Sequence, residues 1–166
     1  MLKSFTMTRF KFFQIRLGMY SAPQKYDNIV FRPTFIEKLA DMLSVAFILS
    51  GVISVVVLAS YAGWQDNYEY LTISLLHFII CLMFLASSYA PVKYYSFAVR
   101  PTEFNWNVQF KLAVRLMRVE SLIFGLCFFF HSLSLSYDWA VIANSVSFVL
   151  LLLALAGYYI IAIIHR

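Results

Sequence analysis

The chain has 166 residues, a formal net charge of +5, 62% hydrophobic residues and only 13% charged residues. A soluble domain carries about 25% charged residues, so this composition excludes a water-soluble globular domain. The basic residues cluster beside long apolar runs, which argues against nucleic acid as a partner. We therefore predict an all-α polytopic membrane protein with four transmembrane helices.

Residues 1–34 form a basic and aromatic segment that we interpret as a cytoplasmic tail. The first acid is Asp27, and several Lys and Arg residues precede it. The segment lacks the apolar run of a secretory signal peptide, although an acid-free start with Arg and Ser is also typical of an organellar transit peptide. We favour a tail that contacts anionic headgroups of the bilayer, at about 1 kcal/mol per basic residue near the surface.

Residues 35–166 are predicted to form the four-span membrane domain. Thr34 and Glu37 have the spacing of a capping box, which predicts a helix start at this point. The apolar run 42–61 follows, and about 20 residues at 1.5 Å each cross the roughly 30 Å hydrocarbon core. Ser44 and Gly51 are small residues that permit close helix packing in this first span. A loop without Lys or Arg then leads to the second span, 71–91.

The link 92–118 is rich in basic residues and separates the two halves of the chain. From about Asn105 its pattern is helical, and Lys111, Arg115 and Arg118 fall on one face at positions i, i+4 and i+7. We predict that this face contacts lipid or a partner. The helix is expected to continue directly into the third span, 119–136, and a short loop leads to the fourth span, 140–164. The spans are expected to form two antiparallel hairpins.

The distribution of basic residues predicts the orientation of the chain. All 13 Lys and Arg residues lie before the first span, in the link or at the last residue, and the two other loops contain none. Cytoplasmic loops of membrane proteins carry an excess of Lys and Arg. Both termini and the link are therefore expected in the cytoplasm.

An ionisable side chain inside a span is a functional candidate, because placing it there is unfavourable. We expect Asp41 to pair with Lys38 or with a headgroup. Glu120 projects away from Arg118 around the helix and is expected to be an intramembrane acid, either paired with a basic residue or protonated at the interface. The candidate partners of Glu120 are Lys38, Lys93 and Arg100.

Two His–Cys pairs form the sharpest constellation of potential ligands. His77 and Cys81 are spaced i, i+4 in the second span, and Cys127 and His131 repeat this spacing in the third. Since these spans are expected to be antiparallel, the four side chains could converge on zinc, copper or haem. The alternative is structural, because Cys in an apolar helix behaves as a small hydrophobe and His can hydrogen-bond across helices. We expect no cofactor and no catalytic residues, since the sequence carries no known catalytic motif.

The segment from Asn107 to Arg118 resembles one found in small bacterial membrane proteins of an uncharacterised-domain family. That family is related to the immunity proteins against the sporulation-delaying toxin. Its members place Asn, then Gln-aromatic-basic-Leu-Ala and two more basic residues before a span, as residues 107–118 do here. The loop 62–70 departs from the family, because it is shorter and lacks a Pro-x-His-aromatic stretch. The resemblance implies a bacterial inner-membrane protein with an immunity or signalling role and no catalytic residue.

These observations lead to three functional hypotheses. The first is a non-enzymatic accessory, regulatory or immunity-like membrane protein that acts through helix–helix and lipid contacts. The second is a metal- or haem-binding subunit of an electron-transfer complex, using the two His–Cys pairs. The third is a structural subunit of a larger membrane complex. A membrane-protein partner or a homo-oligomer is compatible with the first and the third.

Overall fold

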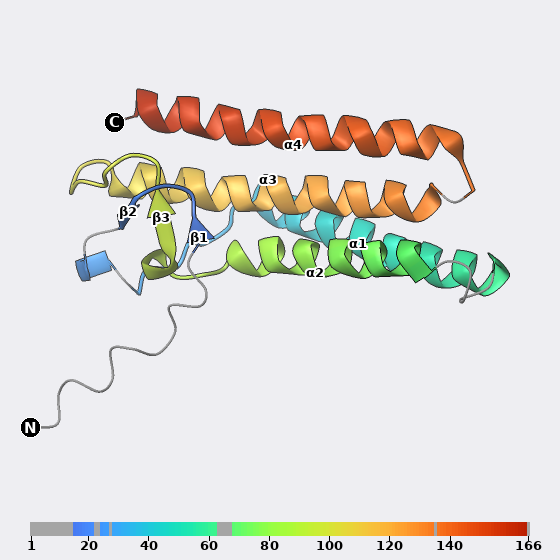
Figure 1. Cartoon of the computed structure of the whole chain (residues 1–166). Helices are drawn as coiled ribbons and strands as arrows, with labels where there is room; N and C mark the ends of the chain where they lie inside the picture. Colours follow the sequence, from blue (N-terminus) through green and yellow to red (C-terminus); the bar gives the residue numbers. More distant parts are fainter. Residues whose placement is uncertain (1–14, 22–23, 27, 63–67, 135, 166) are drawn as a thin grey trace, which may run out of the picture.

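The computed structural model describes residues 15–21, 24–26, 28–62, 68–134 and 136–165 (Figure 1). Within these residues, four long helices form a bundle. They are α1 (Phe35–Ala62), α2 (Tyr68–Ser87), α3 (Trp106–Leu133) and α4 (Asp138–Ile164). This confirms the predicted helical class. The predictions for the first 14 residues and for most of the loop 62–70 fall on positions outside the described residues.

Three of the described helices, α1, α2 and α4, are long and apolar enough to cross a membrane. The prediction of four spans is thereby supported for three helices, in length and composition. The helix α3 is also long, with 28 residues, but it carries several charged residues in its first half. It is continuous from Trp106 to Leu133, as expected for a link helix that runs into the third apolar segment. The helix α2 ends at Ser87, earlier than predicted, and Pro91 disfavours a helical conformation for the residue before it.

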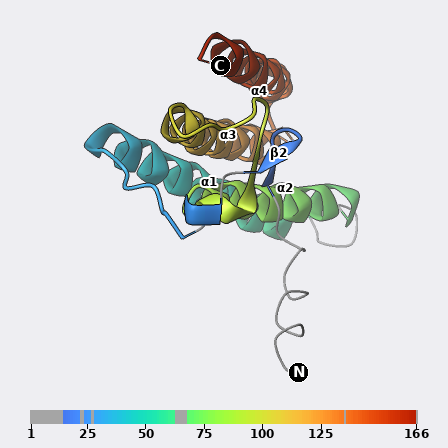
Figure 2. The ribbon, with the colours of Figure 1, turned by 90° about the vertical axis from the view of Figure 1, so that its left-hand side faces the viewer.

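The helix α3 lies at the centre of the bundle, and α1, α2 and α4 all pack on it (Figure 2). Consecutive helices α1 and α2 contact each other much less than each contacts α3. Small residues explain the close approach of α1 to α3. A Cβ atom at Gly125 would lie only 3.3 Å from the Cβ atom of Phe47 and 3.3 Å from the carbonyl oxygen of Ser44. Glycine at this position therefore favours the close approach of the two backbones, since a methyl group would require its neighbours to shift by a few tenths of an ångström.

A small three-stranded sheet joins the predicted tail to the predicted link. The central strand β3 (Tyr95–Phe97) pairs in parallel with β1 (Ile15–Arg16) and antiparallel with β2 (Tyr20–Ser21). Two short 3-10 helices, η1 (Gln24–Tyr26) and η2 (Val92–Tyr94), flank the strands. Residues 15–21 of the predicted tail are thus part of the folded structure. The end of the bundle that carries these strands is called the sheet end below.

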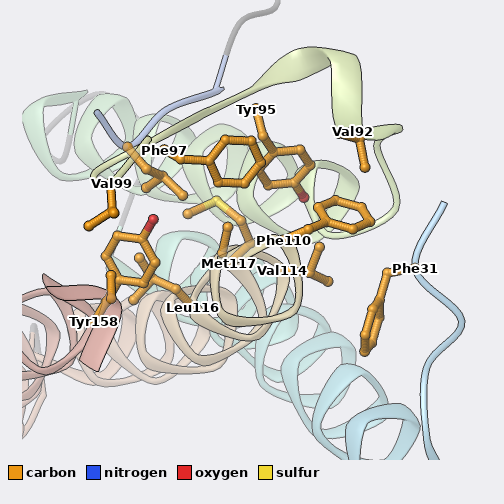
Figure 3. Packing of buried hydrophobic residues seen from close by; sticks show 13 residues of the cluster. Phe31, Val92, Tyr95, Phe97, Val99, Phe110, Val114, Leu116, Met117 and Tyr158 are labelled. Atoms are coloured by element: carbon orange, nitrogen blue, oxygen red, sulfur yellow. The ribbon is translucent and has the colours of Figure 1, made fainter. Parts of the chain in front are cut away.

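Aromatic side chains connect the sheet to the helices (Figure 3). Tyr95 and Phe97 are fully buried, and the ring of Tyr95 packs edge-on against Phe110 of α3 with centroids 5.4 Å apart. The Tyr95 hydroxyl donates a hydrogen bond to the carbonyl oxygen of Ser87, at the end of α2. Burial raises the pKa of Tyr95 above its ordinary value, because the charged phenolate is disfavoured there. The Tyr159 hydroxyl of α4 donates to the carbonyl oxygen of Leu17 at 2.9 Å. The sheet therefore holds the ends of α2, α3 and α4 together.

Gly18 makes the turn between β1 and β2 possible. A Cβ atom at this position would lie 2.0 Å from the carbonyl oxygen of Phe97. We expect Gly18→Ala to separate the turn from β3, since backbone atoms cannot yield to this overlap as a flexible side chain can. Hydrogen exchange at the Leu17 amide, which donates to the Ser96 carbonyl at 3.2 Å, should become at least about tenfold faster, the equivalent of roughly 1.4 kcal/mol.

Gly157→Ala is the matched control for this experiment, because a Cβ atom at Gly157 meets no atom within 4 Å. Exchange at the Leu17 amide should be unchanged in the control. Unchanged exchange in Gly18→Ala as well would show that the turn does not depend on glycine.

Candidate functional site

A buried arginine joins α3 to α1 near the sheet end. Arg118 is only 2% exposed. Its guanidinium lies 3.3 Å from the Asp41 carboxylate and 3.4 Å from the Glu37 carboxylate. The rings of Phe31 and Tyr89 each lie 5.4 Å from its central carbon atom. None of the guanidinium nitrogens makes an aligned hydrogen bond to a described residue, so these contacts are ionic and cation–π in character.

The two acids of this cluster have further partners. Glu37 accepts a hydrogen bond from Nε of Arg115 at 2.8 Å and one from the backbone N–H of Thr34 at 2.7 Å. The Glu37 N–H in turn donates to the Thr34 hydroxyl at 3.4 Å, which confirms the predicted capping box. The Tyr89 hydroxyl donates to Asp41 at 2.5 Å, and this hydrogen bond raises the pKa of Tyr89. Two carboxylates and two guanidiniums thus balance each other between α1 and α3.

This cluster differs from one expectation. Asp41 pairs with Arg118 and Tyr89, whereas Lys38 or a headgroup was expected. Arg118 is buried against α1, and the lipid or partner contact of Lys111, Arg115 and Arg118 stays a prediction. Arg115 remains about half exposed but bonds to Glu37, and Lys111 is exposed. One sequence feature could have predicted this cluster. Glu37 and Asp41 are spaced i, i+4 on one face of α1, and this spacing matches two basic residues one turn apart on α3.

The two predicted ligand pairs lie in the middle of α2 and in the last part of α3, and the structure brings their histidines together. The rings of His77 and His131 stack with centroids 4.9 Å apart, and Tyr70 stacks on His131 at 5.1 Å. The Nδ1 atom of His77 bonds to the carbonyl oxygen of Ile73 at 3.0 Å. Cys81 and Cys127 are buried free thiols. Among the described residues, no three His, Cys, Asp or Glu side chains come close enough to hold one metal ion. The observed role of the histidines is an aromatic stack between α2 and α3.

Glu120 lies on another side of α3 from Arg118. It is only 3% exposed, and it has no hydrogen-bond or ion-pair partner among the described residues. The predicted pairing with Lys38, Lys93 or Arg100 is therefore not observed. Glu120 lines a pocket of about 400 Å³ between α2, α3, α4 and β1. We call it the Glu120 pocket.

A second depression lies between α1 and α2, near the sheet end. It has a volume of about 670 Å³. Its walls are mostly apolar, and Lys38, Asp41 and Tyr89 supply polar groups to its lining. We call it the α1–α2 groove. Its apolar lining includes Met42, Val45, Ala46, Leu49 and Leu85.

Gln109 belongs to the segment that carries the family resemblance, and its contacts indicate a structural role. Its side chain is fully buried. The amide nitrogen donates to the carbonyl oxygens of Ala162 at 3.0 Å and His165 at 3.2 Å. The last carbonyl groups of a helix have no partner within the helix, so Gln109 satisfies that of Ala162 in the last turn of α4 and that of His165 directly after it.

Comparisons with protein-family models, with curated proteins and with solved structures find no match.

Proposed function

We propose that this chain is a non-enzymatic integral membrane protein with an accessory, regulatory or immunity-like role. It acts by binding a transmembrane helix of a partner protein in the α1–α2 groove. The observation that carries this proposal is the groove itself, an apolar depression between two helices that pack mainly on α3 and little on each other. The resemblance of residues 107–118 to the immunity-related family supports the same class of function.

The lining of the groove suits a helix from the bilayer. Ala46 presents the smallest side chain among its apolar residues, and Val45 and Leu49 lie one position before it and three after it on α1. Small residues at a membrane helix interface allow the backbones to approach closely. Lys38 and Asp41 give the groove a polar end, where a partner helix would present interfacial polar groups. A helix is about 10 Å wide, which fits an open groove better than an enclosed cavity.

The proposal includes an orientation in a bacterial inner membrane. We propose that α3 also crosses the membrane, as the third of four spans, and that α1–α2 and α3–α4 are the two hairpins. The sheet end and both termini then face the cytoplasm. The support is the complete segregation of Lys and Arg from the loops 62–70 and 137–139.

A photocrosslinking residue at Leu49 tests the function in the membranes of cells that naturally produce the protein. We expect one crosslinked partner chain. Ala46→Trp should abolish the crosslink, because the indole fills the groove. Val149→Trp on α4, at a position that is 55% exposed, is the matched control and should keep the crosslink.

Two outcomes would contradict the proposal. The first is a crosslink only to a second copy of this chain, which would mean that the groove serves self-association. The second is a crosslink to another protein that persists in Ala46→Trp, which would place the contact outside the groove.

A further inference from the structure

The Glu120 pocket differs from the α1–α2 groove in position and in chemistry. Residues of α2, α3 and α4 form its walls, and β1 closes it at the sheet end. Figure 2 shows the strands lying between α2 and α4 at this end of the bundle. No residue of α1 lines it, so an occupant of the groove would not fill the pocket. Its function is therefore a separate question from partner binding.

Glu120 is the residue of the pocket that indicates a ligand. The buried acid Asp41 has a guanidinium and a phenol as partners, whereas Glu120 has no partner among the described residues. A buried carboxylate without a countercharge is strongly unfavourable. A primary ammonium group supplies both the missing charge and up to three hydrogen-bond donors. A quaternary ammonium supplies the charge without a donor.

Arg16 of β1 supplies the opposite charge to the same pocket. Arg16 is one of the residues that line the pocket, it is exposed, and it forms no ion pair with any described residue. The planar guanidinium matches the geometry of a phosphate group, to which it can donate two hydrogen bonds at once. The pocket therefore presents an acid and a base to one ligand, which fits a zwitterionic headgroup.

The rest of the lining is apolar and limits the size of the ligand. Phe84, Leu151 and Leu155 contribute to walls suited to hydrocarbon. A volume of about 400 Å³ lies within the usual range of small-ligand pockets. A single acyl chain with part of a headgroup fits a pocket of this size.

We propose that the Glu120 pocket binds an aminophospholipid from the surrounding bilayer. The primary ammonium pairs with Glu120, the phosphate lies near Arg16, and one acyl chain packs between α2 and α4. The second acyl chain stays in the bilayer. This site goes beyond the proposed partner binding and does not depend on it.

Native mass spectrometry of the purified protein tests this site. The protein in detergent is incubated with equal amounts of phosphatidylethanolamine, phosphatidylcholine and phosphatidylglycerol with identical acyl chains. Wild type should retain phosphatidylethanolamine about tenfold better than the other two, because only its primary ammonium can donate a charge-assisted hydrogen bond to Glu120. Glu120→Gln should remove this preference. Glu69→Gln, at an exposed acid in the first turn of α2, is the matched control and should keep it.

A second measurement on the wild-type protein covers the case in which Glu120→Gln impairs folding. A phosphatidylethanolamine with a photoreactive acyl chain should label residues of α2 and α4 that line the pocket, Met83 and Leu151 among them. Equal retention of the three lipids by wild type would overturn the proposal, and so would labelling spread evenly over the apolar surface. Ala46→Trp should leave the lipid preference unchanged, so that failure of this site and failure of the partner groove are distinguishable.

Discussion

Arg118→Met is expected to lower the free energy of unfolding by about 3 kcal/mol, near the lower end of the range of roughly 3–5 kcal/mol for removing one partner of a buried ion pair. Arg118 is 2% exposed and Asp41 is 7% exposed, so the remaining carboxylate cannot reach water without a change in packing. The expected loss of stability lies at the lower end of this range because each of the two acids keeps one hydrogen-bond donor after the substitution. Tyr89 still donates to Asp41, and Arg115 still donates to Glu37.

Unfolding in detergent micelles, followed by circular dichroism against denaturant, measures this effect. Arg115→Met is the matched control, since that side chain is 55% exposed, and its loss should have an effect below about 1 kcal/mol. The double change Arg118→Met/Asp41→Leu removes the carboxylate that lost its partner and should recover most of the stability. Equal effects of Arg118→Met and Arg115→Met would show that the buried contact with Asp41 does not stabilise the bundle.

Local signals in the sequence predicted the helices well. The capping box at Thr34 and Glu37 is a pattern of four residues, and the structure contains both of its hydrogen bonds. The unbroken helix from the link into the third apolar segment followed from periodicity alone. Such features depend on neighbours within one or two turns, so a single sequence contains the information that specifies them.

The sheet could not be predicted in the same way. Its strands are two or three residues long, too short for an alternating pattern, and β1 pairs with a strand about 80 positions later in the chain. Tertiary contacts of the aromatic side chains stabilise it, with Tyr95 and Phe97 fully buried under the turn at Gly18. A basic and aromatic segment that leads into this region resembles a headgroup-binding tail until its pairing partner is known.

The basic residues of α3 show a related limit of prediction from the sequence. The stripe of Lys111, Arg115 and Arg118 was identified from helical spacing, but spacing does not tell whether headgroups or an acidic helix face it. The structure gives different environments to residues of one stripe, with Lys111 exposed and Arg118 buried against Asp41. The histidines illustrate the converse. His77 and His131 do come into contact, yet they stack as rings and do not join the cysteines in a ligand group among the described residues.

Gly51→Ala is expected to destabilise the protein by about 1–3 kcal/mol, the usual effect of adding a methyl group to a well-packed interior. A Cβ atom at Gly51 would lie 2.7 Å from the ring of Phe128 on α3. The ring has little room to move, because Phe128 is 2% exposed and is packed with Ile48 and Cys81. The extra methyl group must therefore push α1 away from α3.

Thermal unfolding in detergent measures this effect, and two further variants decide its cause. Gly157→Ala places a methyl group in open space on α4 and should leave stability unchanged or slightly higher, because alanine favours helix by up to about 1 kcal/mol. Gly51→Ala/Phe128→Leu removes the ring that the methyl group meets. The loss of stability in this double variant should be smaller than the sum of the losses in Gly51→Ala and Phe128→Leu. Additive losses would mean that the methyl group acts elsewhere. A coupled pair would show that close packing of Gly51 on Phe128 holds α1 against the central helix, which is the arrangement that keeps Asp41 within reach of Arg118.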